Sequence, residues 1–469
     1  MSATVVLTKI QYALLLVLVF LFPLFFLPVT PDFFDFNKTA LLVVAGLALL
    51  VVWAVKSLYS ERFSFFVTHF DVLILALALV FLLSSFIRTT NKMDAFLFPG
   101  VTTVILSLTL LYFLITQTVR LGEGRGDKLI VALFASGTVL SIFSLGNITG
   151  LLNKIPNLPA FVKQSTFYPA GSSLATFTFL VVLFVMAAVS LAHSRKKKAM
   201  FGVYTLFSTV FLFGAVAVFT QLLPGRPTEL KLMPHGASWA IAVETLKVSP
   251  LGFGPGGFVA AFNQYRPVSY NATSVWSTRF GSSSNWYLGL FTEVGVVGFL
   301  AFAVLLWKAL SFRYHRPALK SALVILALLF LAFPVNFLLL FVFYIVLALG
   351  GSIWGREVSL VSQDSPSRRV LPALLFVVVM GFVASVLFFG KKAYAAEVLY
   401  KIALDSAARN DGDGLFKSLV LAISENPRID RYRIVFSQTN LLGLANELAK
   451  DEEMTEARRD KISRLAQAA

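Results

Sequence analysis

Apolar runs of about 20 residues, the length that a helix needs to cross a 30 Å hydrocarbon core, alternate with short polar segments along most of the chain. This pattern predicts an all-α, polytopic membrane helix bundle of about 11 transmembrane helices, within a range of about 10–12. The expected spans are 10–29, 39–56, 70–88, 96–119, 129–146, 174–193, 200–222, 283–307, 318–332, 335–354 and 371–390. Residues 318–332 are short for a span and Pro334 follows them, so a re-entrant hairpin with the next segment is an alternative.

Two polar regions interrupt the series of apolar runs. We expect residues 1–390 to form the transmembrane domain, with a large outer loop at 223–282 that carries the candidate site. Residues 391–469 are expected to form a helical soluble tail, in which DGDG and NP separate helical segments. Such helix–turn–helix units are typical of tetratricopeptide repeats, and a short helical cap is the alternative. A tail of this kind is a candidate surface for a protein partner.

The composition excludes several classes of site. The chain is 57% hydrophobic and only 14% charged, with a mean hydropathy of +0.80, whereas a soluble domain has about 25% charged residues. It has no cysteine, which excludes disulfides and thiolate metal sites, and its four histidines are scattered. We therefore expect no metal and no cofactor. The net charge is +16, and we expect much of the Lys and Arg to lie in cytoplasmic loops next to the membrane lipids. No nucleic acid partner is expected.

The distribution of basic residues predicts the topology. Lys and Arg outside the tail divide into 17 on the side of the N-terminus and 10 on the opposite side, and half of the 10 lie in the long loop. Because cytoplasmic loops carry the excess of Lys and Arg, the N-terminus is expected inside and loop 223–282 outside. With an odd number of spans, the C-terminal tail is outside as well. The expected location is a cell membrane, in a multi-pass arrangement.

The outer loop contains the first candidate site residues. The segment His235–Val248 has helical spacing and places Trp239 as an interfacial anchor. The glycines of SPLGFGPGGF, at 249–258, are expected to form a tight turn and not a phosphate-binding loop, because no strand precedes them and no GK[ST] follows. His235 is a candidate base, with a plain surface histidine as the alternative.

Two arginines of the outer loop are candidate phosphate ligands. Arg266 and Arg279 lie among aromatic residues, and guanidinium groups bind phosphate and diphosphate oxygens through paired hydrogen bonds. The alternative is that they pair with lipid phosphates or with loop carbonyls. The apolar span that follows adds Asn285 at its mouth and Glu293 about two turns inside. A carboxylate at that depth is expensive, which indicates a functional site or a buried partner.

The segments HGASWAIAVETLKVSPLGFGPGGF and SNWYLGLFTEVGVVG, between His235 and Gly298, together resemble the O-antigen ligase and O-antigen polymerase family. Its members are membrane glycosyltransferases that use glycans linked to a polyprenyl diphosphate. Their pattern has Arg and then Trp four residues on, P-L-x-G-x-G, an outer loop, and His-Asn that nine intervening residues separate from G-[VLI]-x-G. The matching positions are Trp239, Pro250, Leu251, Gly252, Gly254, Asn285, Glu293, Gly295 and Gly298. The sequence departs at His235, where the family commonly has the Arg, and at Ser284, where its ligases have a His.

The resemblance implies transfer of a glycan from a polyprenyl-diphosphate carrier to a lipid or glycan acceptor on the outer face, in cell-surface polysaccharide biosynthesis. Under this hypothesis His235 or Glu293 is the catalytic base. Arg266 and Arg279 bind the diphosphate, and Asn285, Trp239 and Ser284 complete the substrate site. A transporter of lipid-linked glycans, or a family member that binds the carrier without catalysis, are the alternatives. A transporter is expected to carry charges inside several other spans.

Overall fold

The computed structural model describes residues 3–60, 64–120, 124–359, 370–448 and 455–468. Three basic residues used in the topology prediction, Arg62, Arg368 and Arg369, lie outside these ranges. The fold is helical, and the sheet found in the described residues is one antiparallel ribbon of β1 (Ser64–Val67) and β2 (Arg356–Ser359). Ser64 lies opposite Ser359, and Val67 lies opposite Arg356.

The helices up to the long loop follow the predicted spans, except that the first begins at Ala3 and ends by Leu24, several residues before the predicted 10–29. In chain order they are α1 (Ala3–Leu21), η1 (Phe22–Leu24), α2 (Asp35–Ser60), α3 (Asp71–Ile87), α4 (Lys92–Phe96), α5 (Val101–Val119), α6 (Arg125–Ile148), η2 (Leu151–Lys154), α7 (Ser173–His193) and α8 (Lys198–Leu222). The loop and the rest of the chain contain α9 (His235–Val248), α10 (Phe258–Tyr265), η3 (Val268–Ala272), α11 (Trp286–Glu293), α12 (Gly295–Ser311), α13 (Pro317–Ala332), α14 (Phe337–Gly351), α15 (Val370–Ala408), α16 (Gly412–Glu425), α17 (Asp430–Leu448) and α18 (Glu456–Ala468).

Within the described residues, seven helices are long and apolar enough to cross a membrane. Four further apolar helices, α3, α12, α13 and α14, are shorter, with 15–17 residues each. At 1.5 Å per residue they rise about 22–26 Å, which is less than the thickness of an average hydrocarbon core. A membrane protein is thus supported, while the count of about 11 spans stays a prediction.

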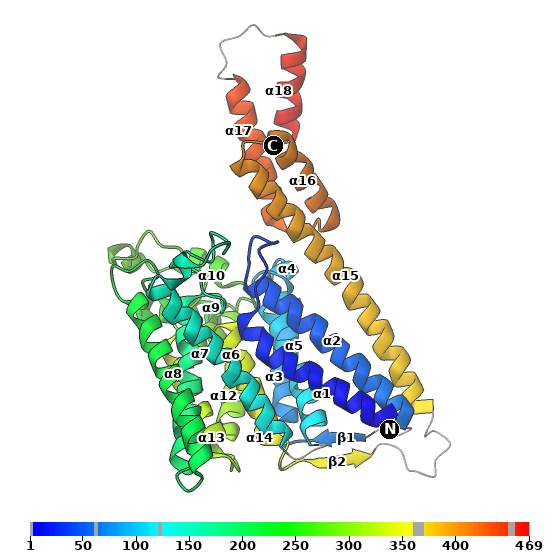
Figure 1. Cartoon of the computed structure of the whole chain (residues 1–469). Helices are drawn as coiled ribbons and strands as arrows, with labels where there is room; N and C mark the ends of the chain where they lie inside the picture. Colours follow the sequence, from blue (N-terminus) through cyan, green and yellow to red (C-terminus); the bar gives the residue numbers. More distant parts are fainter. Residues whose placement is uncertain (1–2, 61–63, 121–123, 360–369, 449–454, 469) are drawn as a thin grey trace. The chain divides into compact units, whose positions relative to one another are not determined.

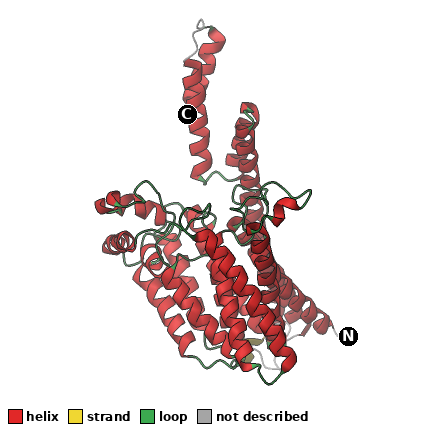
Figure 2. Ribbon diagram, turned by 60° about the vertical axis from the view of Figure 1, so that its left-hand side comes forward, coloured by secondary structure: helices red, strands yellow, loops and turns green. Residues whose placement is uncertain are grey.

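The chain divides into two compact units, 1–26 with 34–383 and 27–33 with 384–469. In the larger unit, α14 is buried along its whole length and packs against α5 and α13. Apolar side chains on α8, including Leu206, Phe213 and Phe219, are exposed, as expected for a surface that faces lipid. Figure 2 shows the long helices of this unit lying side by side, with loops at their ends.

The smaller unit is helical, as predicted. The expected boundary at residue 390 falls inside α15, which continues to Ala408 because residues 391–408 are mostly good helix formers. Its helices α16 and α17 pack together, and the buried Glu397 forms an ion pair with Arg431 and accepts a hydrogen bond from Tyr432. The assignment of this unit as tetratricopeptide-like stays a prediction.

Candidate functional site

The long loop 223–282 is folded into its own small structure at one end of the larger unit. In Figure 1, α9, α10 and α4 gather at this end and the β1–β2 ribbon lies at the other. Helix α9 begins at His235 and ends at Val248, which are the limits that the helical spacing predicts. The loop has a hydrophobic core formed by Met233, Ala237, Ile241, Phe258, Ala261, Phe262 and Tyr270. The Tyr270 hydroxyl lies 2.8 and 2.7 Å from the carbonyl oxygens of Val275 and Thr278, which share its single hydrogen, and so holds the following segment.

The glycine-rich segment after α9 is a tight turn, as predicted. Gly252, Gly254 and Gly256 have φ values of +73°, +104° and +77°, a region in which side chains are strained. Close packing adds a second requirement, because a Cβ on Gly252 would lie 2.7 Å from the carbonyl carbon of Glu293. The turn therefore needs glycine to approach the backbone of the helix that follows the loop.

That approach interrupts the helix, so the expectation of one continuous helix across 283–307 is wrong. Helix α11 ends at Glu293, and α12 begins at Gly295 with a φ of +71°. The Phe253 amide donates a hydrogen bond to the Thr292 carbonyl at 2.8 Å, and the Val296 amide donates one to the Pro250 carbonyl at 3.0 Å. Hydrogen bonds to the glycine turn thus take the place of helical hydrogen bonds for the carbonyls of Thr292 and Glu293 and for the amide of Val296.

Glu293 has a buried partner in the outer loop. Its carboxylate interacts with the backbone amides of Gly256 and Phe258, at the N-terminus of α10. A carboxylate in this position satisfies amides that the helix leaves unpaired and complements the helix dipole. The sequence indicated either a functional site or a buried partner for this carboxylate. The two backbone amides provide the buried partner, and a catalytic role for Glu293 stays a prediction.

His235 and Ser284 are in direct contact. The Nδ1 atom of His235 lies 2.9 Å from Oγ of Ser284, although the two residues are 49 positions apart in the sequence. The backbone amide of Ser284 donates to Oγ of Ser238 at 3.0 Å. Ser284 is 1% exposed, whereas His235 is exposed. The first turn of α9 therefore holds the mouth of α11 through two hydrogen bonds, and it presents the imidazole on the surface.

Two other predicted site residues, Asn285 and Trp239, lie near His235 and Ser284 in the sequence of α11 and α9. The Asn285 side-chain oxygen accepts from the Leu288 amide at 2.9 Å, so Asn285 caps α11. Trp239 lies one turn after His235 on α9 and is 58% exposed. The Ser283 hydroxyl is buried and has no hydrogen-bond partner among the described residues. The site thus combines an imidazole, an exposed aromatic ring and an unsatisfied hydroxyl at the starts of two helices.

The two predicted arginines have different surroundings. The Arg266 guanidinium lies over the rings of Phe262 and Tyr270, at 5.7 and 5.2 Å from their centroids. Arg279 is exposed and has no ion-pair or hydrogen-bond partner among the residues that the structure describes. Arg266 is thus held by aromatic rings, Arg279 is exposed, and a phosphate-binding role for either stays a prediction.

Sequence reasoning missed two residues that support the site. Arg88, at the end of α3, donates from Nε to the Gly252 carbonyl at 3.1 Å. The sequence did offer a signal for Arg88, because this arginine ends an apolar run on the same predicted side of the membrane as the loop. Ser238, which lies on the same face of α9 as His235, was not distinguishable from any other helical serine. Both residues act through the backbone, which no motif encodes.

The described residues contain no group of three or more His, Asp or Glu side chains placed to hold a metal ion. No protein-family model matches the chain, and no curated protein matches it in sequence.

Proposed function

We propose that the protein is a membrane glycosyltransferase that moves a glycan from a polyprenyl-diphosphate carrier to an acceptor on the outer face of the membrane. The contact between His235 and Ser284 carries the proposal, because it supplies an imidazole at the mouth of α11. The resemblance of the segments around it to the O-antigen ligase and polymerase family provides the substrate class.

The contact accounts for both departures from the family pattern. The family's ligases have a histidine at the position of Ser284, and this chain has its imidazole at His235, the position of the family's arginine. Since the two side chains touch, an imidazole from α9 occupies the neighbourhood of the missing one. In this chain, therefore, the base comes from the first turn of α9, at His235, and not from the position of Ser284 at the start of α11.

The reaction follows from the groups present. The acceptor hydroxyl attacks the anomeric carbon of the donor sugar and a new C–O bond forms. The bond from that carbon to the carrier phosphate breaks, and its electron pair leaves with the diphosphate. The acceptor proton passes to Nε2 of His235, provided that Nδ1 carries its hydrogen toward Ser284 Oγ. Such general-base catalysis contributes roughly 10²–10⁴-fold to the rate.

The remaining residues position the substrate. Arg279 and Arg266 neutralise the charge that develops on the leaving diphosphate, so that the transfer needs no metal ion. Trp239 presents an exposed aromatic face beside His235 for a sugar ring or for the carrier. Glu293 holds α10 and the glycine turn in place through its interactions with the amides of Gly256 and Phe258, and in this scheme it is a positioning residue.

A member of the same family that binds the carrier without catalysis is the second candidate. Ser284 is 1% exposed and the Glu293 carboxylate interacts with two backbone amides, so among the residues that the structure describes His235 is the exposed base at the mouth of α11. If His235 takes no proton, the same arginines and Trp239 still form a binding surface.

A glycan profile of a deletion strain tests the proposal. We expect lipid-linked glycan to accumulate while the surface polymer is shortened or missing, and a plasmid copy of the gene to reverse both changes. A missing link to the acceptor indicates a ligase, and short chains that are still linked indicate a polymerase. Unchanged carrier-linked glycan and an unchanged surface polymer would reject the proposal.

A further inference from the structure

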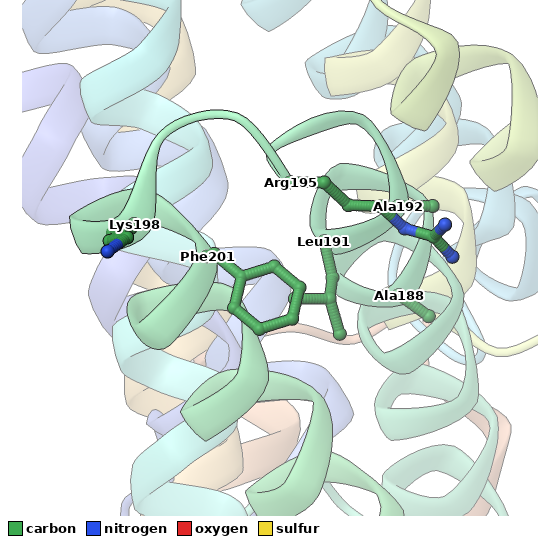
Figure 3. Close-up of a pocket in the computed structure, with 6 residues that line it drawn as sticks. All are labelled: Ala188, Leu191, Ala192, Arg195, Lys198 and Phe201. Atoms are coloured by element: carbon green, nitrogen blue, oxygen red, sulfur yellow. The ribbon is translucent and has the colours of Figure 1, made fainter.

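A cavity lies at the end of the helical hairpin formed by α7 and α8, at the turn that joins them. It has a volume of about 630 Å³, which lies in the range of small-molecule sites. Its lining residues are Ala188, Leu191, Ala192, Arg195, Lys198 and Phe201 (Figure 3). The cavity belongs to the same unit as the candidate site but is formed by different helices.

The turn above this cavity carries an uncompensated positive charge. Arg195, Lys196, Lys197 and Lys198 are consecutive and exposed, and none of them forms an ion pair with a described residue. The sequence from 128 to 228 contains no Asp or Glu at all. An anion that binds here therefore meets no carboxylate from either helix of the hairpin.

The floor of the cavity is apolar. Leu191 and Phe201 lie between the two basic residues, with Ala188 and Ala192 beside them (Figure 3). The small alanine side chains leave room, and Phe201 is 41% exposed. Farther along α8, Leu212 and Phe219 lie on the same helix face as Phe201, and they are 44% and 48% exposed. A charged rim above an apolar floor suits a molecule with an anionic head and a hydrocarbon chain.

From this arrangement we infer that the cavity binds an anionic phospholipid. Arg195 and Lys198 lie on opposite sides of the opening (Figure 3), and each offers the anionic head group a charge-assisted hydrogen bond, as a guanidinium and an ammonium both do with phosphate. The first part of an acyl chain lies against Leu191 and Phe201. The inference does not depend on the glycosyltransferase proposal, and it differs from the general rule that basic loops face the cytoplasm, because it requires particular residues of the turn.

Lys196 and Lys197 provide the matched control for this inference. They belong to the same turn and carry the same charge, but they do not line the cavity. Loss of Arg195 and Lys198 removes two units of charge from the site, and loss of Lys196 and Lys197 removes two units beside it. Non-specific attraction to an anionic surface responds equally to both pairs of changes.

The test is native mass spectrometry of the full-length protein with phosphatidylglycerol and phosphatidylcholine. We expect the wild type to retain phosphatidylglycerol preferentially. Arg195→Gln with Lys198→Gln should lower this retention by about 10- to 100-fold, whereas Lys196→Gln with Lys197→Gln should change it less than about twofold. Phe201→Ala should weaken retention of the lipid, and free glycerol phosphate should not compete.

Three results would overturn the inference. The first is a wild type that retains the two lipids equally, a measurement that needs no variant. The second is an equal loss in both double variants, which would indicate a basic turn without a built site. The third is displacement of the lipid by millimolar glycerol phosphate with no effect of Phe201→Ala, which would identify a site for free phosphate.

Discussion

Nδ1 of His235 lies 2.9 Å from Oγ of Ser284, and this contact joins the first turn of α9 to the residue that precedes the cap of α11. It fixes the orientation of the imidazole ring. With Nδ1 engaged, Nε2 is the ring nitrogen left for a substrate. The buried serine therefore acts on the exposed histidine, and neither residue alone explains the site.

Ser284→Ala tests whether this orientation matters. The change removes one hydrogen bond, worth about 0.5–1.5 kcal/mol, and leaves the ring free to rotate. We expect the rate of glycan transfer to fall about 2- to 12-fold, with little change in KM. Ser282→Ala is the matched control, because Ser282 is an exposed serine two residues earlier. Equal rates of glycan transfer in the two variants would show that Ser284 has no role in the reaction.

The arginines should respond differently to truncation. Arg279→Ala removes a side chain without a partner among the described residues, so we expect weaker carrier binding and an unchanged melting temperature. The loss of a charge-assisted contact to phosphate corresponds to about 1.5–3 kcal/mol, roughly 10- to 100-fold in transfer at low carrier concentration.

Arg266→Ala should also lower the melting temperature, since Arg266 packs over Phe262 and Tyr270. Arg226→Ala, an exposed arginine of the same loop, should alter neither quantity. Titration of the carrier against purified protein measures the binding. Carrier affinity equal to that of the wild type in the Arg266→Ala, Arg279→Ala double variant would remove both residues from the site.

Glu293→Gln separates the positioning role of Glu293 from a catalytic one. The amide keeps a single acceptor oxygen for the two backbone donors of Gly256 and Phe258, and an unsatisfied buried donor costs about 1–3 kcal/mol. We expect a lower melting temperature, with transfer per folded molecule within about threefold of wild type. Glu244→Gln, which breaks only the surface pair with Lys247, is the control. Normal stability with abolished transfer would instead make Glu293 the base.

Gly295→Ala should disrupt the joint between α11 and α12. Gly295 has a φ of +71°, and a Cβ there would lie 2.0 Å from the Pro250 carbonyl oxygen. The left-handed conformation alone costs about 1–2 kcal/mol for alanine, and the clash adds to it. We expect a large drop in melting temperature or loss of monodisperse protein in detergent. A Cβ on Gly281 would have no neighbouring atom within 4 Å, so Gly281→Ala should be tolerated. Equal melting temperatures for both variants would contradict the observed packing.

The sequence predicted the features that depend on local pattern. Hydrophobic runs located most helices, helical spacing located α9, and the absence of a strand before the glycines identified a tight turn. The break at Val294 was missed, because the hydrogen bonds that cause it come from Pro250 and Phe253, about 40 residues earlier. The run of helix formers after Gly390 likewise gave no stop signal for α15.

The candidate site shows the same division. Its residue types were visible in the sequence, but the contact of His235 with Ser284 was not, because it depends on how α9 packs against α11. Arg88 was missed for the same reason, since its partner is a backbone carbonyl of the glycine turn.

His235→Asn is the most direct test of the account. Asparagine keeps a hydrogen-bonding group near the Nδ1 position and removes Nε2, the nitrogen assigned to take the acceptor proton. The measurement is the ratio of carrier-linked to transferred glycan in a deletion strain that carries this variant, at membrane protein levels matched to wild type. We expect the ratio of the uncomplemented deletion strain, since loss of a general base costs about 10²–10⁴ in rate. Full restoration of the surface glycan by His235→Asn would contradict the account.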